Sequence, residues 1–399
     1  MEKSVIKYMI LSLLCLSWTG RKKADSVRCW RLGALLLLLS ACVTDYEPKG
    51  LEQVRDLLVV DGIVTNGETV VRLSRSVGLL DDFKGEEYVN NAQVAVERQD
   101  GVRYVASLIT EKGEYGATIG ELAPGEKYRV HITVDGEEYA SEYLMPVITP
   151  PIDTVSLLKA DQGQPVHLCV STHGSPDAST CYRWTYKENW EVKAEMFATA
   201  GLDYVDGRET VVYYDLTTSN NTYYCWGKDS SKVMVLGSSD KLTENVISNK
   251  KLVTMEPDDK RLSILYHVEV AQYALRREAY DYYFNLQKNV EESGGLFSPI
   301  PSEMKGNIQC LSDPDVPVIG YVEVATVARV KRFLPEIKDL YEEKRMYCDI
   351  IEGMPQAGYS LLNYDPFPGG EITSALTRCV DCRRGATKDK PSWWPTSHL

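Results

Sequence analysis

The segment YRVHITVDGEEYAS, residues 128–141, decides the fold class. Its apolar residues fall at every second position from Tyr128 to Val134, which is the period of a β-strand with one buried face. Asp135-Gly136 follows, and an Asp-Gly pair supplies the positive φ angles of a tight hairpin turn. The segment therefore predicts a β-hairpin that carries His131 on its solvated face.

Strand patterns surround this hairpin on both sides and predict a β-rich domain over residues 54–148. A second Asp-Gly pair, Asp100-Gly101, separates two of them. The other expected strands span residues 57–60, 69–73, 92–98, 102–108 and 138–144. Six short strands at this spacing predict a small Ig-like or transthyretin-like β-sandwich. A Pro-rich stretch, residues 145–153, cannot continue a central strand and marks the expected domain boundary.

Residues 149–399 are expected to form a larger β-rich domain with one or two helices. Strands are expected at 152–159, 165–171, 181–187, 210–217, 232–237, 262–270 and 318–330. Tyr273, Arg276, Tyr280, Tyr283/Phe284 and Gln287 recur at helical spacing and predict a helix over residues 272–292, ended by Gly294-Gly295. The aromatic stripe of this helix suits a core face better than a ligand platform. A shorter helix is expected after Pro335, through Tyr347.

The N-terminal 41 residues have the pattern of a secretion signal. The first of two apolar stretches precedes basic residues, and the second follows them. Each is about ten residues long, so neither reaches the ~18 residues of a membrane span. The second ends in Leu39-Ser40-Ala41-Cys42, which resembles the bacterial lipobox and predicts lipidation of Cys42. The alternative is a core cysteine after a Leu-rich helix. Because a lipoprotein needs only one such stretch, residues 1–26 are expected to precede the true start, at Val27.

The chain that follows the signal is strongly acidic. Residues 1–42 hold seven of the 44 basic and two of the 57 acidic residues, so the rest carries a net charge of −18. This charge argues against nucleic acid as a partner and leaves membrane attachment to the lipid on Cys42. Residues 42–53 form the expected tether, in which Asp45 and Glu47 resemble an export signal to the cell surface.

Seven cysteines remain after Cys42, and an exported protein is expected to form disulfides. Cys169 lies in a strand-like run and is expected to be free, packed as a small apolar residue. The other six are disulfide candidates of open connectivity: Cys181, Cys225, Cys310, Cys348, Cys379 and Cys382. The Cys379-Val-Asp-Cys382 spacing also allows zinc or redox chemistry, but structural disulfides are favoured because no second close pair exists.

Sequence motifs of catalysis are missing. The five histidines form no HExxH motif, and neither GxSxG nor a P-loop is present. His167 and Cys169 share a strand face, where simple packing is the favoured interpretation. No catalytic residue, metal site or cofactor is therefore predicted.

Two further sites are expected near the surface. Asp153-Thr154-Val155 resembles a bacterial O-glycosylation site, which makes Thr154 a modification candidate. Trp393 and Trp394 near the C-terminus either dock back on the protein or mark a partner contact.

Motifs in a fixed order along the chain resemble the DUF4249 family of Bacteroidetes lipoproteins. They are Leu58-Val59-Val60-Asp61-Gly62-Ile63-Val64-Thr65-Asn66, Asn91-Ala92-Gln93-Val94, Pro150-Pro151-Ile152-Asp153, Cys225-Trp226, Glu278-Ala279-Tyr280, Gly294-Gly295-Leu296-Phe297, Pro301, Gly306-Asn307-Ile308, Gly320-Tyr321, Cys379-Val-Asp-Cys382-Arg383 and Lys390-Pro391-Ser392-Trp393-Trp394. The resemblance implies an outer-membrane lipoprotein of undetermined function, encoded beside TonB-dependent receptors. It therefore implies an accessory or binding role in uptake at the cell surface. The alternatives are a surface enzyme, such as a glycosidase or peptidase, and a structural or adhesive protein.

Overall fold

The fold is mainly β, as predicted, and is described here from a computed structural model. The structure describes residues 56–76, 87–123, 125–215, 221–292, 306–334 and 337–395. Within these residues, several β-sheets are joined by one long helix and a few helical turns. No helix in the described part of the chain has the length and apolarity needed to cross a membrane.

The N-terminal region forms a ten-stranded sheet in the order β18-β8-β7-β4-β5-β6-β2-β1-β19, with β3 paired to β2. Its strands are β1 (Leu58–Val64), β2 (Gly67–Arg75), β3 (Glu87–Tyr88), β4 (Gln93–Arg98), β5 (Arg103–Thr110), β6 (Glu114–Ile119), β7 (Tyr128–Val134), β8 (Glu137–Ser141), β18 (Ile308–Cys310) and β19 (Ile319–Val324). The first half of β5 pairs with β4 and its second half with β6. Side chains from both halves of the sheet share one hydrophobic core, as a β-sandwich requires.

Both predicted Asp-Gly hairpins are confirmed. Asp135 and Gly136 take φ angles of 54° and 86°, and a type I′ turn needs positive φ at both central residues. Gly101, between β4 and β5, also has a positive φ of 97°. The six expected strands are present with ends shifted by a few residues, and β3 and β6 are additional.

The following part of the chain forms two sheets that pack against each other. One has the order β16-β10-β9, and the other has the order β14-β11-β17-β20 with β15 also paired to β11. The strands are β9 (Ile152–Lys159), β10 (Val166–His173), β11 (Cys181–Lys193), β14 (Tyr224–Ser230), β15 (Val235–Ser238), β16 (Val246–Met255), β17 (Leu265–Leu275) and β20 (Val327–Phe333). Apolar residues of both sheets form one core around Trp184, Tyr182 and Tyr266.

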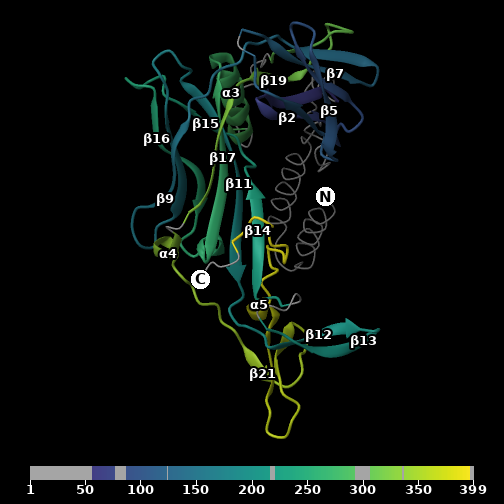
Figure 1. The fold of residues 1–399 in the computed structure, drawn as a ribbon, viewed down its shortest axis with the longest axis vertical. Helices are drawn as coiled ribbons and strands as arrows, with labels where there is room; N and C mark the ends of the chain where they lie inside the picture. Colours follow the sequence, from purple (N-terminus) through teal and green to yellow (C-terminus); the bar gives the residue numbers. More distant parts are fainter. Residues whose placement is uncertain are drawn as a thin grey trace, which may run out of the picture. The chain divides into compact units, whose positions relative to one another are not determined.

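The long helix α3 spans Arg277–Glu292, so the predicted start at residue 272 is wrong by five residues. Residues 272–275 instead complete β17, because they pair in antiparallel register with residues 181–184 of β11. Figure 1 shows α3 beside the ends of β11 and β17. The helix buries Ala279, Tyr282 and Tyr283 against strands of both regions.

The C-terminal part is built from small elements. They are the hairpin β12 (Ala200–Val205) and β13 (Arg208–Tyr213), the sheet β21-β23-β22 (Ile350–Glu352, Ile372–Leu376 and Tyr359–Tyr364) and the turn α5 (Thr377–Val380). Figure 1 shows them together at one end, where β12 contacts β22. The helix expected from Pro335 to Tyr347 is limited to α4 (Ile337–Leu340), and residues 341–349 lie outside regular structure.

Strands β18 and β19 return from the second region to the N-terminal sandwich. β19 pairs in parallel with β1, and β18 pairs with β8. Gly320 makes the parallel pairing possible, because a Cβ there would lie 2.1 Å from the Val60 carbonyl oxygen and its φ is +143°. The region after residue 148 thus contributes two strands to the sandwich, while the predicted domain boundary itself stays a prediction.

Candidate functional site

The described residues give no support to Cys–His or metal chemistry. In the ranges that the structure describes, no group of three or more His, Cys, Asp or Glu residues is placed to hold a metal ion. The His167 ring lies 3.1 Å from Thr254 Oγ1 and 3.0 Å from Lys251 Nζ. Cys169 is buried, and burial raises the pKa of its thiol. A thiol that resists ionisation is a poor nucleophile.

Two disulfides join four of the six predicted cysteines. Cys225 pairs with Cys382 and Cys348 with Cys379, at Cα–Cα distances of 5.7 and 5.9 Å. The two cysteines of the CxxC motif therefore bond to different distant partners. This arrangement fixes the C-terminal segment to β14 and to the loop before β21.

Cys181 and Cys310 are free, which contradicts their predicted pairing. They are buried in different hydrophobic clusters, Cys181 beside α3 and Cys310 inside the sandwich core, so each packs as a small apolar side chain. Cys169 is free, as predicted.

The two terminal tryptophans dock back on the protein to different degrees. Trp394 is 3% exposed, and its indole Nε1 donates to Glu191 Oε2 at 2.9 Å. Trp393 remains 51% exposed and stacks at a tilt on His267, with 4.5 Å between the ring centroids. Trp394 therefore docks on the protein. The ring of Trp393 is exposed, so a contact of this residue with a partner protein stays a prediction.

Two other predicted sites remain untested. Thr154 is exposed on β9, an edge strand, so a modifying enzyme could reach it, and glycosylation there stays a prediction. Leu39, Ser40, Ala41 and Cys42 lie outside the described residues.

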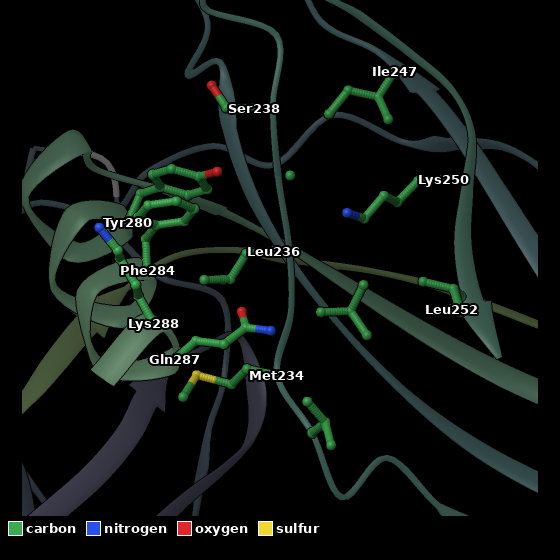
Figure 2. Close-up of a pocket in the computed structure, with 13 residues that line it drawn as sticks. Met234, Leu236, Ser238, Ile247, Lys250, Leu252, Tyr280, Phe284, Gln287 and Lys288 are labelled. Carbon is green, nitrogen blue, oxygen red and sulfur yellow. The ribbon is translucent and has the colours of Figure 1, made fainter. Parts of the chain in front are cut away.

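A cavity lies where the edges of two sheets meet beside α3. It has a volume of about 780 Å³, and we call it the α3 groove. β15 is an edge strand of one sheet and β16 is an edge strand of the other. One face of α3, which carries Tyr280, Phe284, Gln287 and Lys288, borders the space between them (Figure 2). The residues that line it are Val233, Met234, Val235, Leu236, Gly237, Ser238, Ile247, Lys250, Leu252, Tyr280, Phe284, Gln287 and Lys288.

Two aromatic rings form the helical wall of the α3 groove. Tyr280 and Phe284 are four residues apart and so lie on one face of α3. Their rings stack with centroids 6.0 Å apart and an interplanar angle of 16°. Phe284 is 49% exposed, whereas Tyr283, one position earlier, is 2% exposed. The prediction that the aromatic stripe faces the core is therefore confirmed for Tyr283 and wrong for Phe284. The exposed ring of Phe284 leaves an aromatic surface in the groove.

Lys250 faces this wall from β16. Figure 2 shows its side chain extending into the space that Tyr280 and Phe284 approach from the helix. Burial lowers the pKa of the Lys250 ammonium, and no acidic partner of it is found among the described residues. Sequence reasoning missed Lys250, since a lysine in a polar strand carries no signal of what it faces.

A set of charge contacts holds α3 against the strands behind the groove. Arg183 on β11 bonds both oxygens of Asp61 on β1, at 3.1 and 3.3 Å, and lies over the Tyr283 ring. Tyr283 donates to the Tyr321 carbonyl oxygen at 2.8 Å. Burial acts to raise the pKa of Asp61, but the charge and hydrogen bonds of Arg183 outweigh it and lower the pKa. The helical wall is thus fixed to both the sandwich and the second sheet.

The polar groups in the lining of the α3 groove are few. None of its described lining residues is Asp, Glu, His or Cys, while Ser238, Tyr280 and Lys250 supply a hydroxyl, a phenol and an amine. A glycosidase needs a pair of carboxyl groups flanking the scissile bond. Apolar walls with a few polar groups are instead typical of ligand pockets.

Comparison with known proteins identifies the family. The family described as "Domain of unknown function (DUF4249)" matches residues 43–331, and the chain belongs to it. A comparison with curated proteins finds no match. Among solved structures, the chain is similar to a DUF4785 family protein from Legionella pneumophila, with 12% identity over 55% of this chain and a TM-score of 0.15. The match spans about half of that protein, 51%, and the TM-score is too low to establish a shared fold.

Proposed function

We propose that this DUF4249 protein is a lipid-anchored binding subunit of a TonB-dependent uptake system at the surface of the outer membrane. The lipobox-like residues Leu39–Cys42 support the anchor, and the family resemblance supports the receptor as partner. The proposal assigns the protein to capture and delivery of a ligand and gives the chemistry of transport to the receptor.

The α3 groove is the observation that carries this proposal. It has the volume of a small-molecule pocket, and aromatic and aliphatic side chains dominate its walls. A glycosidase would require a pair of carboxyl groups there, and none of the described lining residues carries one. A purely structural protein would have no use for an aromatic pair kept exposed at a cavity.

The test is a pull-down from native outer membranes in mild detergent, with a C-terminal tag, followed by mass spectrometry. A stoichiometric TonB-dependent β-barrel is the expected co-purifying protein. A Cys42→Ala variant is the matched control, since it removes the lipid acceptor and leaves the described residues unchanged. Recovery of the wild-type lipoprotein without a barrel would refute the transporter role and make hydrolysis screens the next experiment.

A further inference from the structure

We propose that the α3 groove selects a flat or elongated apolar molecule that carries one anionic group. The apolar body would lie against Tyr280 and Phe284, and the anion would meet the ammonium of Lys250. This inference rests on the proposed function only in taking the groove as the ligand site, and it holds whether or not a receptor is the partner.

The apolar part of the ligand follows from the walls of the groove. Leu236 on β15 and Leu252 on β16 supply aliphatic surface, as does Met234 just before β15. The stacked rings of Tyr280 and Phe284 lie on the helix. Phe284 and Val233 keep 49% and 65% of their surfaces exposed at the groove. A ligand body that covers them removes apolar surface from water, which is the main favourable term in such binding.

The charge of the ligand follows from the polar lining. Two lysines, Lys250 and Lys288, line the groove and no described lining residue is acidic, although the chain after Cys42 carries a net charge of −18. A half-buried ammonium in apolar surroundings is disfavoured until an anion approaches it. Lys250 is therefore a local positive group in the groove of an acidic protein, and it favours anions over cations.

The same lining argues against a neutral sugar as the main ligand. A sugar buried in a cavity needs hydrogen-bond partners for several hydroxyl groups. Apart from the two lysines and Tyr280, the polar side chains that line the groove in the described structure are Ser238 and Gln287. This polar set suits one charged group with a few hydrogen bonds better than a ring of hydroxyls.

The experiment compares two probes that share one ring system and differ in charge. The full-length lipoprotein in nonionic detergent is titrated calorimetrically with 2-naphthoate and with neutral 2-naphthamide, against a detergent-only blank. We expect wild type to bind 2-naphthoate about 10-fold more tightly, because a hydrogen bond to a charged group is worth about one such factor or more. Equal affinity for the two probes, or no binding of either, would overturn the proposal.

Matched variants separate the two parts of the site. Lys250→Met should reduce the preference for naphthoate to about 1-fold. Lys251→Met should leave it intact, since Lys251 contacts His167 on β10 and is not a lining residue of the groove. Phe284→Ala should weaken both probes by about 10-fold. Phe367→Ala removes an aromatic ring outside the groove that is even more exposed, at 76%, and should change neither affinity.

The outcome is independent of the receptor. Thermal unfolding of each variant verifies that its fold is retained before its affinity is compared. A naphthoate preference that survives Lys250→Met refutes the assigned role of Lys250. Selective naphthoate binding without a co-purifying β-barrel would refute the uptake role alone and leave the ligand class standing.

Discussion

Loss of the Cys225–Cys382 disulfide should be the most destabilising cysteine change in this protein. The bond closes a chain segment of 157 residues, whereas Cys348–Cys379 closes one of 31. The loop-closure relation gives about 5 kcal/mol for the longer loop and about 4 kcal/mol for the shorter one, and measured losses for native disulfides fall at about 2–5 kcal/mol. Replacing each bonded pair by alanines should therefore lower the free energy of unfolding by at least about 2 kcal/mol.

The structural consequence is local to the C-terminal segment. Cys382 ties this segment to β14, and the residues after it form a bridge from Thr387 to Trp226 and place Trp394 against Glu191. Without the disulfide, only non-covalent contacts hold the residues after Cys382 against β14 and β11. The segment should then become the first site of proteolytic cleavage in the folded protein.

Chemical denaturation with and without reductant measures the effect. Wild type should shift to lower denaturant when reduced, and the Cys225→Ala/Cys382→Ala variant should shift less, because only the Cys348–Cys379 bond is left to reduce. Cys181→Ala and Cys310→Ala are the controls, because both thiols are free and only small side-chain volumes are lost. Maleimide labelling of the denatured, unreduced chain should count three thiols among the seven cysteines after Cys42. A count of one, or no effect of reductant on unfolding, would refute the reasoning.

The remaining predictions concern the polar contacts behind the groove and at the C-terminus. Asp61→Asn should cost about 2 kcal/mol of unfolding free energy, since Arg183 is 11% exposed and loses its carboxylate, while Asp61 is itself 46% exposed. Because the pKa of Asp61 is lowered below its usual 3.8, its contribution is complete above that value and is lost as the pH falls through the folded-state pKa, so the difference between wild type and variant should shrink in acid titrations. Trp394→Phe should cost about 2 kcal/mol by removing the indole donor to the buried Glu191, and unchanged unfolding would contradict that contact.

Local patterns predict many strands of this fold, but not all of them and not all of their ends; β14 and β16, for example, were not expected. The alternation from Tyr128 to Val134 and the Asp135-Gly136 turn depend on neighbouring residues alone, and both are confirmed. The start of α3 was misplaced because residues 272–275 fit a helical stripe and an alternating strand equally well. Pairing with β11, about 90 residues earlier, decides in favour of the strand.

Local sequence patterns do not predict which strands pair when they lie far apart in the chain. β1 and β19 lie more than 250 residues apart and form a parallel pair, whose register appears in the sequence only as an unexplained glycine, Gly320. The disulfide pairing is not predictable from local sequence either. The sequence shows that cysteines are available, but only the fold brings Cys225 beside Cys382. Burial of Cys181 and Cys310 in separate clusters likewise depends on which strands meet.

The α3 groove combines these two kinds of information. Helical spacing places Tyr280 and Phe284 on one face of α3, and that much is readable from the sequence. Whether the face is buried depends on β15 and β16, which are edge strands of two different sheets and leave a gap that neither sheet fills. Lys250 enters the same gap only because β16 pairs with β10 rather than with β15. The site thus forms at two strand edges that do not pair with each other. A sequence pattern does not show which strand edges stay unpaired.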